Sequence, residues 1–115
     1  MILEANEELQ RISFSIILHA GNARSSAMEA IKLAKENRIQ EAQAKMDSAD
    51  VDFVKAHQEQ SQLLSKEIRH PDENHLSIIL VHAQDHLMNA LTIKDLAWEM
   101  IEMYQRLNKL EVAIT

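Results

Sequence analysis

The sequence is almost free of residues that break helices. Its 115 positions contain one glycine and one proline, so the chain is expected to form long helices. Aromatic residues make up only 3% of it, and no useful length shows the apolar–polar alternation that is typical of strands. The sequence therefore predicts an all-α fold, and its length suits a single domain spanning residues 1–115.

Charge and cysteine content limit the classes of function. The formal net charge is −6 and the basic residues are dispersed, so nucleic acid is not an expected partner. The chain has no cysteine, which removes disulfides and thiolate nucleophiles and favours the cytoplasm. The apolar runs are far shorter than the roughly 20 residues of a membrane span, and the N-terminus is acidic rather than signal-like. We expect a cytoplasmic protein without direct membrane insertion.

Apolar residues recur at helical spacing in three segments. The segments cover residues 3–36, residues 39–67, and a third stretch that begins between residues 74 and 76 and ends at 111. The polar turn "ENR" joins the first two, and the loop "RHPDEN", with candidate N-caps, precedes the third. Three helices with short connections predict an antiparallel up-down-up bundle.

The third segment carries two apolar stripes on nearly opposite sides of a helical wheel. One stripe consists of Ile78, Ile93, Leu96, Met100, Met103 and Leu107, and the other of Leu76, Leu80, Leu87, Leu91 and Trp98. Two partner helices cannot cover a helix that is apolar on both sides. We therefore expect self-association through this helix in a closed symmetric assembly, whose number of copies the pattern leaves open.

Three polar residues interrupt the apolar run "SIILVHAQDHLMN" (residues 77–89). His82, Asp85 and His86 lie at i, i+3 and i+4, so they share one helix face with the first stripe. A carboxylate among apolar residues needs a partner or a proton. If the stripe faces a symmetry axis, copies of Asp85 converge, and a shared proton or a cation would relieve their repulsion.

Several chemistries fit this cluster. The two histidines can be core-edge residues bonded to backbone, Gln84 or Asn89. Their spacing also suits a metal, but Ala83 stands where a zinc hydrolase needs its glutamate base. A structural His/Asp metal site in a helical oligomer that serves as an interaction scaffold remains open. So does a phosphohistidine, because a neutral imidazole accepts phosphoryl groups near pH 7.

Three motifs resemble one protein family. "LVHAQDHLMNA" (residues 80–90) closely resembles the active-site segment of the enzyme IIA proteins of the lactose/cellobiose family of the bacterial phosphoenolpyruvate-dependent sugar phosphotransferase system. "IILHAGNARSSAMEAI" (16–31) is similar to the first-helix signature of that family, and "AHQEQSQLL" (56–64) to its second-helix segment. Their order and spacing also match, so the resemblance covers essentially the whole chain.

The resemblance implies roles for individual residues. His82 is expected to accept the phosphoryl group on Nε2, with His86 and Gln84 in supporting roles. Asp85 is expected to gather with its copies around a divalent cation, expected to be Mg²⁺, on the threefold axis of a homotrimeric nine-helix bundle. Possible roles of Gln60 and Asn89 stay open, and His57 is expected to pack rather than to border the site.

The resemblance also implies partners. The phosphoryl donor is expected to be the carrier HPr, and the acceptor a cysteine of the cognate IIB protein or domain. Through IIB and the membrane component IIC, the group would reach a disaccharide such as cellobiose or lactose. This chain departs from the family mainly in its two connections, because relatives usually have a Gly-Asp turn in place of "ENR" and a glycine within the second loop. His19, His70 and His75 are expected to be surface or loop residues.

Overall fold

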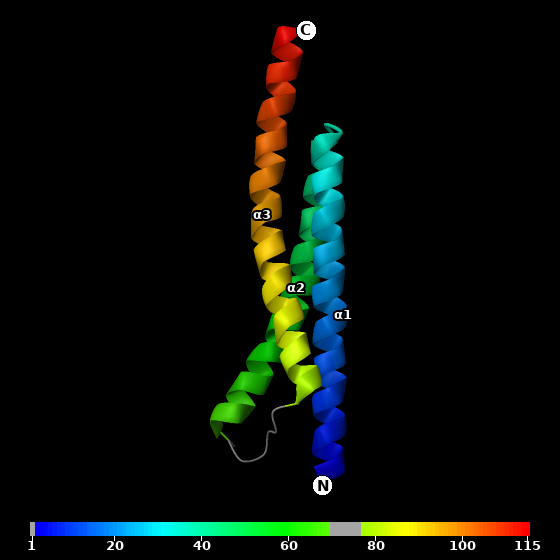
Figure 1. Cartoon of the computed structure of the whole chain (residues 1–115), viewed down its shortest axis with the longest axis vertical. Coiled ribbons are helices and arrows are strands. Elements are labelled where there is room, and N and C mark those ends of the chain that lie inside the picture. Colours follow the sequence, from blue (N-terminus) through cyan, green and yellow to red (C-terminus); the bar gives the residue numbers. More distant parts are fainter. Residues whose placement is uncertain (1, 70–76) are drawn as a thin grey trace.

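The computed structural model describes residues 2–69 and 77–115. Within these ranges the chain forms three helices and no strand: α1 (Ile2–Lys35), α2 (Ile39–Arg69) and α3 (Ile78–Ile114). The helices make an elongated bundle of 68 × 19 × 19 Å in which α2 runs opposite to α1 and α3 (Figure 1). The all-α, up-down-up prediction is confirmed. No helix of the described ranges is long and apolar enough to cross a membrane.

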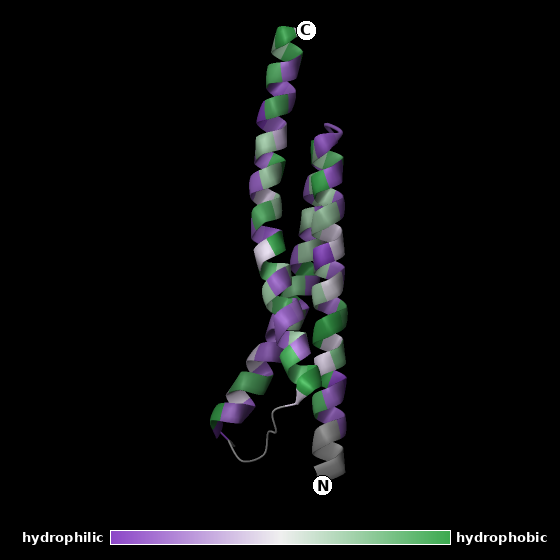
Figure 2. Cartoon of the chain, viewed as in Figure 1, coloured by the Kyte–Doolittle hydropathy of each residue, from purple (hydrophilic) through white to green (hydrophobic). Residues whose placement is uncertain are grey.

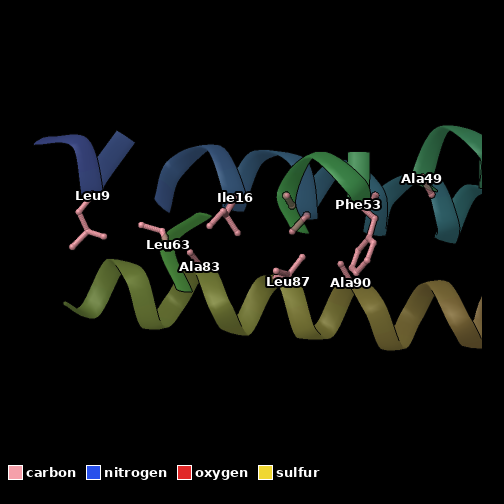
Figure 3. Packing of buried hydrophobic residues seen from close by; sticks show 11 residues of the cluster. Leu9, Ile16, Ala49, Phe53, Leu63, Ala83, Leu87 and Ala90 are labelled. Atoms are coloured by element: carbon pink, nitrogen blue, oxygen red, sulfur yellow. The ribbon is translucent and has the colours of Figure 1, made fainter. Parts of the chain in front are cut away.

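Alanines let the three helices approach closely. In α1 the buried positions include five alanines, each no more than 1% exposed: Ala20, Ala23, Ala27, Ala30 and Ala34. Larger side chains such as Ile16 of α1, Met46 of α2 and Leu87 of α3 are fully buried. Leu9, Ile16, Leu63 and Leu87 point into the space between the helices in Figure 3. This packing places α1 against both neighbours, whereas α2 and α3 contact each other least.

The α1–α2 turn is closed by backbone bonds and a left-handed asparagine. Asn37 has φ 63°, and its N–H donates to the Ala34 carbonyl at 3.0 Å, while the Arg38 N–H donates to the Leu33 carbonyl at 2.9 Å. This pair of bonds is the Schellman arrangement. Asn tolerates the left-handed region better than most residues, which explains how "ENR" forms a tight turn without glycine.

α3 begins at a cap that differs from the predicted one. Ser77 adopts extended backbone angles, and its side chain accepts a hydrogen bond from the Leu80 N–H at 3.2 Å. The helix therefore begins at Ile78, and the prediction of a start between residues 74 and 76 is wrong because Ser77 is not helical. The Asp and Asn candidates in "RHPDEN" lie outside the described residues, as does Leu76. At the other end α3 continues to Ile114, three residues beyond the predicted end at 111.

The two apolar stripes of α3 have different surroundings. Leu87 is buried and Leu80 and Leu91 pack against the core, so this stripe faces the bundle. Leu96, Met100, Met103 and Leu107 are 43–62% exposed. Ile93 belongs to the same predicted stripe as these exposed residues, but it packs against the core beside Met46 and Ile101. Trp98 belongs to the predicted stripe that faces the bundle, but at 37% exposed it lies at the bundle edge.

The C-terminal part of α3 extends past the α1–α2 turn (Figure 1). Asn108 bonds to the end of α1, its Nδ2 donating to the Ala34 carbonyl at 3.2 Å. Beyond it, Leu110, Val112 and Ile114 are 60–83% exposed. Figure 2 shows apolar residues recurring along this projecting segment. A single chain thus leaves a long apolar surface of α3 uncovered.

Candidate functional site

His82 and His86 contact each other one turn apart near the start of α3. Their Nε2 atoms are 3.1 Å apart, and the rings meet edge to face with centroids 4.5 Å apart and planes at 89°. His82 is exposed and His86 is partly buried. The side chain of His82 is therefore open to solvent, while the neighbouring imidazole of His86 contacts its Nε2 and fixes the direction of the ring.

Asp85 lies on the uncovered side of α3. Its side chain is exposed, and it lines a shallow hollow together with Ile78, Val81 and His82. Ile78 is 90% exposed and Val81 52% exposed. The carboxylate therefore sits among apolar side chains, as the sequence pattern predicted, but at an open surface of the single chain rather than inside its core.

Gln84 is held by α2. Its Oε1 accepts a hydrogen bond from Gln60 Nε2 across the α2–α3 interface. Both side chains are partly buried. The structure thus brings Gln60 and Gln84 together. Gln84 is hydrogen-bonded to α2 and not to His82. The sequence does not reveal this pair, because two residues 24 positions apart leave no local pattern.

No hydrogen bond joins the remaining described candidates to the two histidines. His57 stacks on Phe53 of its own helix, with ring centroids 6.0 Å apart and planes at 26°, in agreement with a packing role. His19 is not an idle surface residue: its Nδ1 lies 3.0 Å from Asp52 Oδ1, tying α1 to α2. Asn89 is exposed. His70 and His75 lie outside the described residues.

The polar contacts between helices include two further ties. Ser15 Oγ donates to Glu59 Oε1 at 2.9 Å, linking α1 to α2. Lys94 Nζ of α3 lies 3.1 Å from Asp50 Oδ1 of α2 and 4.6 Å from the centroid of the Phe53 ring. These contacts align the helices away from the histidines and add no metal-binding group to them.

Ion pairs at the surface shift the pKa values of Glu29, Arg38 and Glu41. The hydrogen bond and charge of Lys45 lower the pKa of Glu29. Hydrogen bonds from Arg38 lower the pKa of Glu41, and the same contacts with Glu41 and Glu36 raise the pKa of Arg38. Arg38 Nε lies 2.6 Å from Glu41 Oε2, so these charges brace the α1–α2 turn at the end of the bundle opposite to His82.

No set of three or more His, Cys, Asp or Glu side chains placed to hold a metal ion occurs within residues 2–69 and 77–115 of one chain. His82, His86 and Asp85 do not converge on one point.

The structure thus places an exposed histidine, in contact with a second imidazole, near the start of the third helix of a three-helix bundle. Residues 11–105 match the sequence model of the family described as "PTS system, Lactose/Cellobiose specific IIA subunit". The chain therefore belongs to the lactose/cellobiose-specific IIA family of the phosphotransferase system, and is a phosphotransferase component.

Individual relatives agree with this membership. The lichenan-specific phosphotransferase enzyme IIA component of Bacillus subtilis is 47% identical over 104 residues, which are 90% of this chain and 94% of that protein. The lactose-specific EIIA component of Streptococcus mutans is 40% identical over 87% of this chain and 95% of that protein. These relatives are known for different sugars, so family membership alone does not select one.

Solved structures share the fold. The crystal structure of the cellobiose-specific enzyme IIA of Bacillus anthracis superposes with a TM-score of 0.84 at 44% identity, covering 88% of this chain and 92% of that one. The solution structure of the IIA(chitobiose)–HPr complex of the Escherichia coli phosphotransferase system gives 0.71 at 32% identity, covering 87% and 96%. The fold predicted by resemblance is thus confirmed at the level of the single chain.

Proposed function

We propose that this chain is a phosphocarrier that uses His82 as its phosphoryl acceptor. In the first step the lone pair of His82 Nε2 attacks phosphorus in phospho-HPr, the P–N bond to HPr breaks, and the HPr imidazole leaves with the bonding electrons. In the second step a thiolate of IIB attacks the same phosphorus. The P–N bond to His82 breaks, a P–S bond forms, and His82 regains its lone pair.

The contact between His82 and His86 carries this proposal. A nucleophilic Nε2 on His82 must be unprotonated, so its proton resides on Nδ1. In the 3.1 Å contact the proton then belongs to His86 Nε2, which donates to His82. This bond holds the ring in one direction. Because it occupies the single lone pair of His82 Nε2, it opens when phospho-HPr docks on the exposed ring, and the freed lone pair attacks phosphorus.

His86 has a second use once the phosphoryl group arrives. The new P–N bond occupies the lone pair of His82 that His86 had bonded. The Nε2–H of His86 is then free to donate to a phosphoryl oxygen, and a donor already in place stabilises the charge on that group. His86 is thus a supporting residue. Gln84 contributes from the opposite side of the helix, through its bond to Gln60.

Self-association completes the functional unit, and we propose a homotrimer forming a nine-helix bundle. Its central seam is a heptad series of uncovered residues on α3, spaced alternately by four and three: Leu96, Met100, Met103, Leu107, Leu110 and Ile114. Such spacing produces a left-handed coiled coil, and the threefold axis of the trimer makes its three helices parallel. In this register Arg106 occupies position g and faces position e of the next copy, Glu111, so the flanking charges are complementary.

In the proposed trimer, the three copies of Asp85 bind one divalent cation. Three exposed carboxylates, one from each copy, fit a divalent ion because hard cations such as Mg²⁺ prefer oxygen ligands. One carboxylate per chain on an uncovered apolar face agrees with such a shared site. When bound, the ion supplies charge neutralisation among the three carboxylates, and the chain itself performs the phosphoryl transfer through His82.

The remaining parts of the proposal follow from the family and its relatives. HPr is the donor, as the chitobiose IIA relative in complex with HPr supports. The acceptor is the cognate IIB in the cytoplasm, acting with membrane IIC. The sugar is a disaccharide such as cellobiose or lactose, and the lichenan-specific and cellobiose-specific relatives favour a β-glucoside.

Labelling tests the phosphocarrier role. The chain is incubated with phosphoenolpyruvate, enzyme I and HPr, and the incorporated phosphoryl group should be acid-labile and base-stable. His82→Ala should take up less than about 1% of the label, because the nucleophile is gone. His57→Ala is the matched control, since it removes another exposed histidine and should label fully. Full labelling of His82→Ala would refute the assignment.

A second candidate, a structural metal scaffold, has one observation in its favour. Two histidine nitrogens bound to one ion at about 2.0–2.1 Å lie little more than 3 Å apart, close to the separation of the two Nε2 atoms here. This candidate predicts that a chelator dissociates the assembly and that no phosphoryl group is incorporated. Light scattering with and without chelator, beside the labelling assay, separates the two functions.

A further inference from the structure

Two amide side chains connect α2 to α3 on the side of α3 that faces away from His82. Gln84 follows His82 by two residues, which turns its direction by about 200° around the helix. Its Oε1 accepts from Gln60 Nε2 of α2. The Gln60–Gln84 bond, which we call the amide clasp, therefore grips α3 beside the phosphoryl acceptor without touching it.

The clasp lies where α2 and α3 are otherwise weakly joined. α2 and α3 share the smallest helix–helix interface of the bundle, and the last turns of α2 diverge from the other helices (Figure 1). Ile68, in that diverging part, is 82% exposed. Among the described side chains, the other polar tie between these helices is Lys94 with Asp50, and Lys94 lies more than three turns of helix beyond His82. Among the described residues, the amide clasp is thus the polar contact between α2 and α3 in the half of α3 that carries His82.

A small rotation of α3 would move His82 far enough to matter. A side chain ends about 5–6 Å from the helix axis, so turning the helix by about 10° displaces it by about 1 Å. A misplacement of about 1 Å can slow a reaction roughly 100-fold. The hydrophobic effect is not directional, whereas a hydrogen bond between two amides is directional, so the amide bond adds an angular restraint to the packing of Ala83 and Leu87.

We propose that Gln60 is a positioning residue for phosphoryl transfer: through Gln84 it fixes the rotation of α3 and hence the direction in which His82 points. This rests on the proposed function of His82. Gln60 touches neither the phosphoryl group nor the acceptor ring. It acts from the neighbouring helix, through the far side of α3.

The first experiment compares single-turnover transfer from phospho-HPr in matched variants. Gln60→Ala should lower the maximal rate about 10- to 100-fold, with the concentration of phospho-HPr at half-maximal rate changed by less than about 2-fold. Gln58→Ala removes an exposed glutamine two residues earlier on the same helix and should transfer at the wild-type rate. Gln60→Glu should restore most of the rate, because its carboxylate can accept from Gln84 Nε2.

The second experiment tests whether Gln60 acts through Gln84. In a double-mutant cycle, the variant that carries both Gln60→Ala and Gln84→Ala should have a maximal transfer rate within about 2-fold of that of Gln84→Ala alone. Side-chain nitrogen NMR should show the His82 ring signals broadened or shifted in Gln60→Ala and unchanged in Gln58→Ala. Circular dichroism follows folding throughout. If Gln60→Ala unfolds, Gln60→Met fills the space without the amide and takes its place.

Two results would overturn the inference: a wild-type maximal rate in Gln60→Ala, or a double variant whose loss equals the product of the single losses. Either result leaves the phosphocarrier role intact as long as His82 is labelled. Conversely, full labelling of His82→Ala would remove the proposed function itself. The two failures are therefore distinguishable in the same set of proteins.

Discussion

Leu107→Asp should abolish self-association while leaving the single chain folded. Leu107 is 47% exposed in the single chain and belongs to the heptad seam of α3. Full burial of a leucine stabilises by about 1.5–3 kcal/mol, so covering the exposed half contributes about 1 kcal/mol. Three copies meet at one level of a trimer, which makes about 3 kcal/mol, or a factor above 100 in the association constant.

The aspartate adds a larger cost to this loss. Three carboxylates would converge in the seam, and desolvating each ion costs several kcal/mol. At micromolar concentration Leu107→Asp should therefore sediment as a monomer. Leu107→Ala, which removes the apolar contact without adding charge, should weaken association about 100-fold.

Sedimentation velocity over a range of concentrations is the assay, with circular dichroism to confirm that the helices remain. Val54→Asp is the control, since Val54 is also an exposed apolar residue, 50% exposed, but on α2. It should leave the assembly intact. The reasoning fails if the wild-type chain is monomeric throughout, if Leu107→Asp assembles normally, or if Val54→Asp dissociates equally.

Substitutions at four further positions test other parts of the molecule. Asn37→Ala should lower the free energy of unfolding by about 1 kcal/mol and Asn37→Gly raise it by about 0.5 kcal/mol in urea denaturation, because φ is 63° there. Gly21→Ala should raise it by about 0.5–1 kcal/mol, since a Cβ would meet nothing within 4 Å; a loss would contradict an open site. Arg38→Gln should return the lowered pKa of Glu41 toward its ordinary value in NMR titrations. Because folding lowers the pKa of Glu41, the stability from this pair is present above the pKa of the unfolded chain and is lost as pH falls through the pKa of the folded chain. Asp85→Leu should preserve the assembly and make light scattering insensitive to chelator; dissociation to monomers would show that the cation rather than the apolar seam holds the copies together.

The fold was predictable because its determinants are local and periodic. Scarce breakers and repeated apolar positions fix three long helices, and the observed bounds of α1 differ from the predicted ones by one residue at each end. The start of α3 was missed because several Asp, Asn and Ser residues could serve as the cap. The residue that serves as the cap depends on where α3 begins to pack in the bundle, and in the structure this residue is Ser77.

The site was predictable only in part. Residue spacing placed His82, Asp85 and His86 on one side of the helix, and the structure sharpens this: the histidines contact each other, while Asp85 lies on the uncovered apolar face. The tie of Gln84 to Gln60 was invisible, because it depends on the relative rotation of two helices. So was the pairing of His19 with Asp52 across 33 positions, since no one-dimensional pattern records which helix faces which.

The start of α3 is divided into sides with separate tasks, and the division explains the arrangement of its polar residues. Ala83 and Leu87 fill the bundle core, Gln84 bonds α2, and Asp85 lies on the uncovered apolar face. His82 lies between the core side and that uncovered side. In the proposed trimer this is the border between neighbouring subunits, where a ring stays reachable by partner proteins while the helix that carries it is held on every other side. A phosphocarrier that serves two partners in turn requires both properties, because transfer needs access at the nitrogen and rigidity behind it.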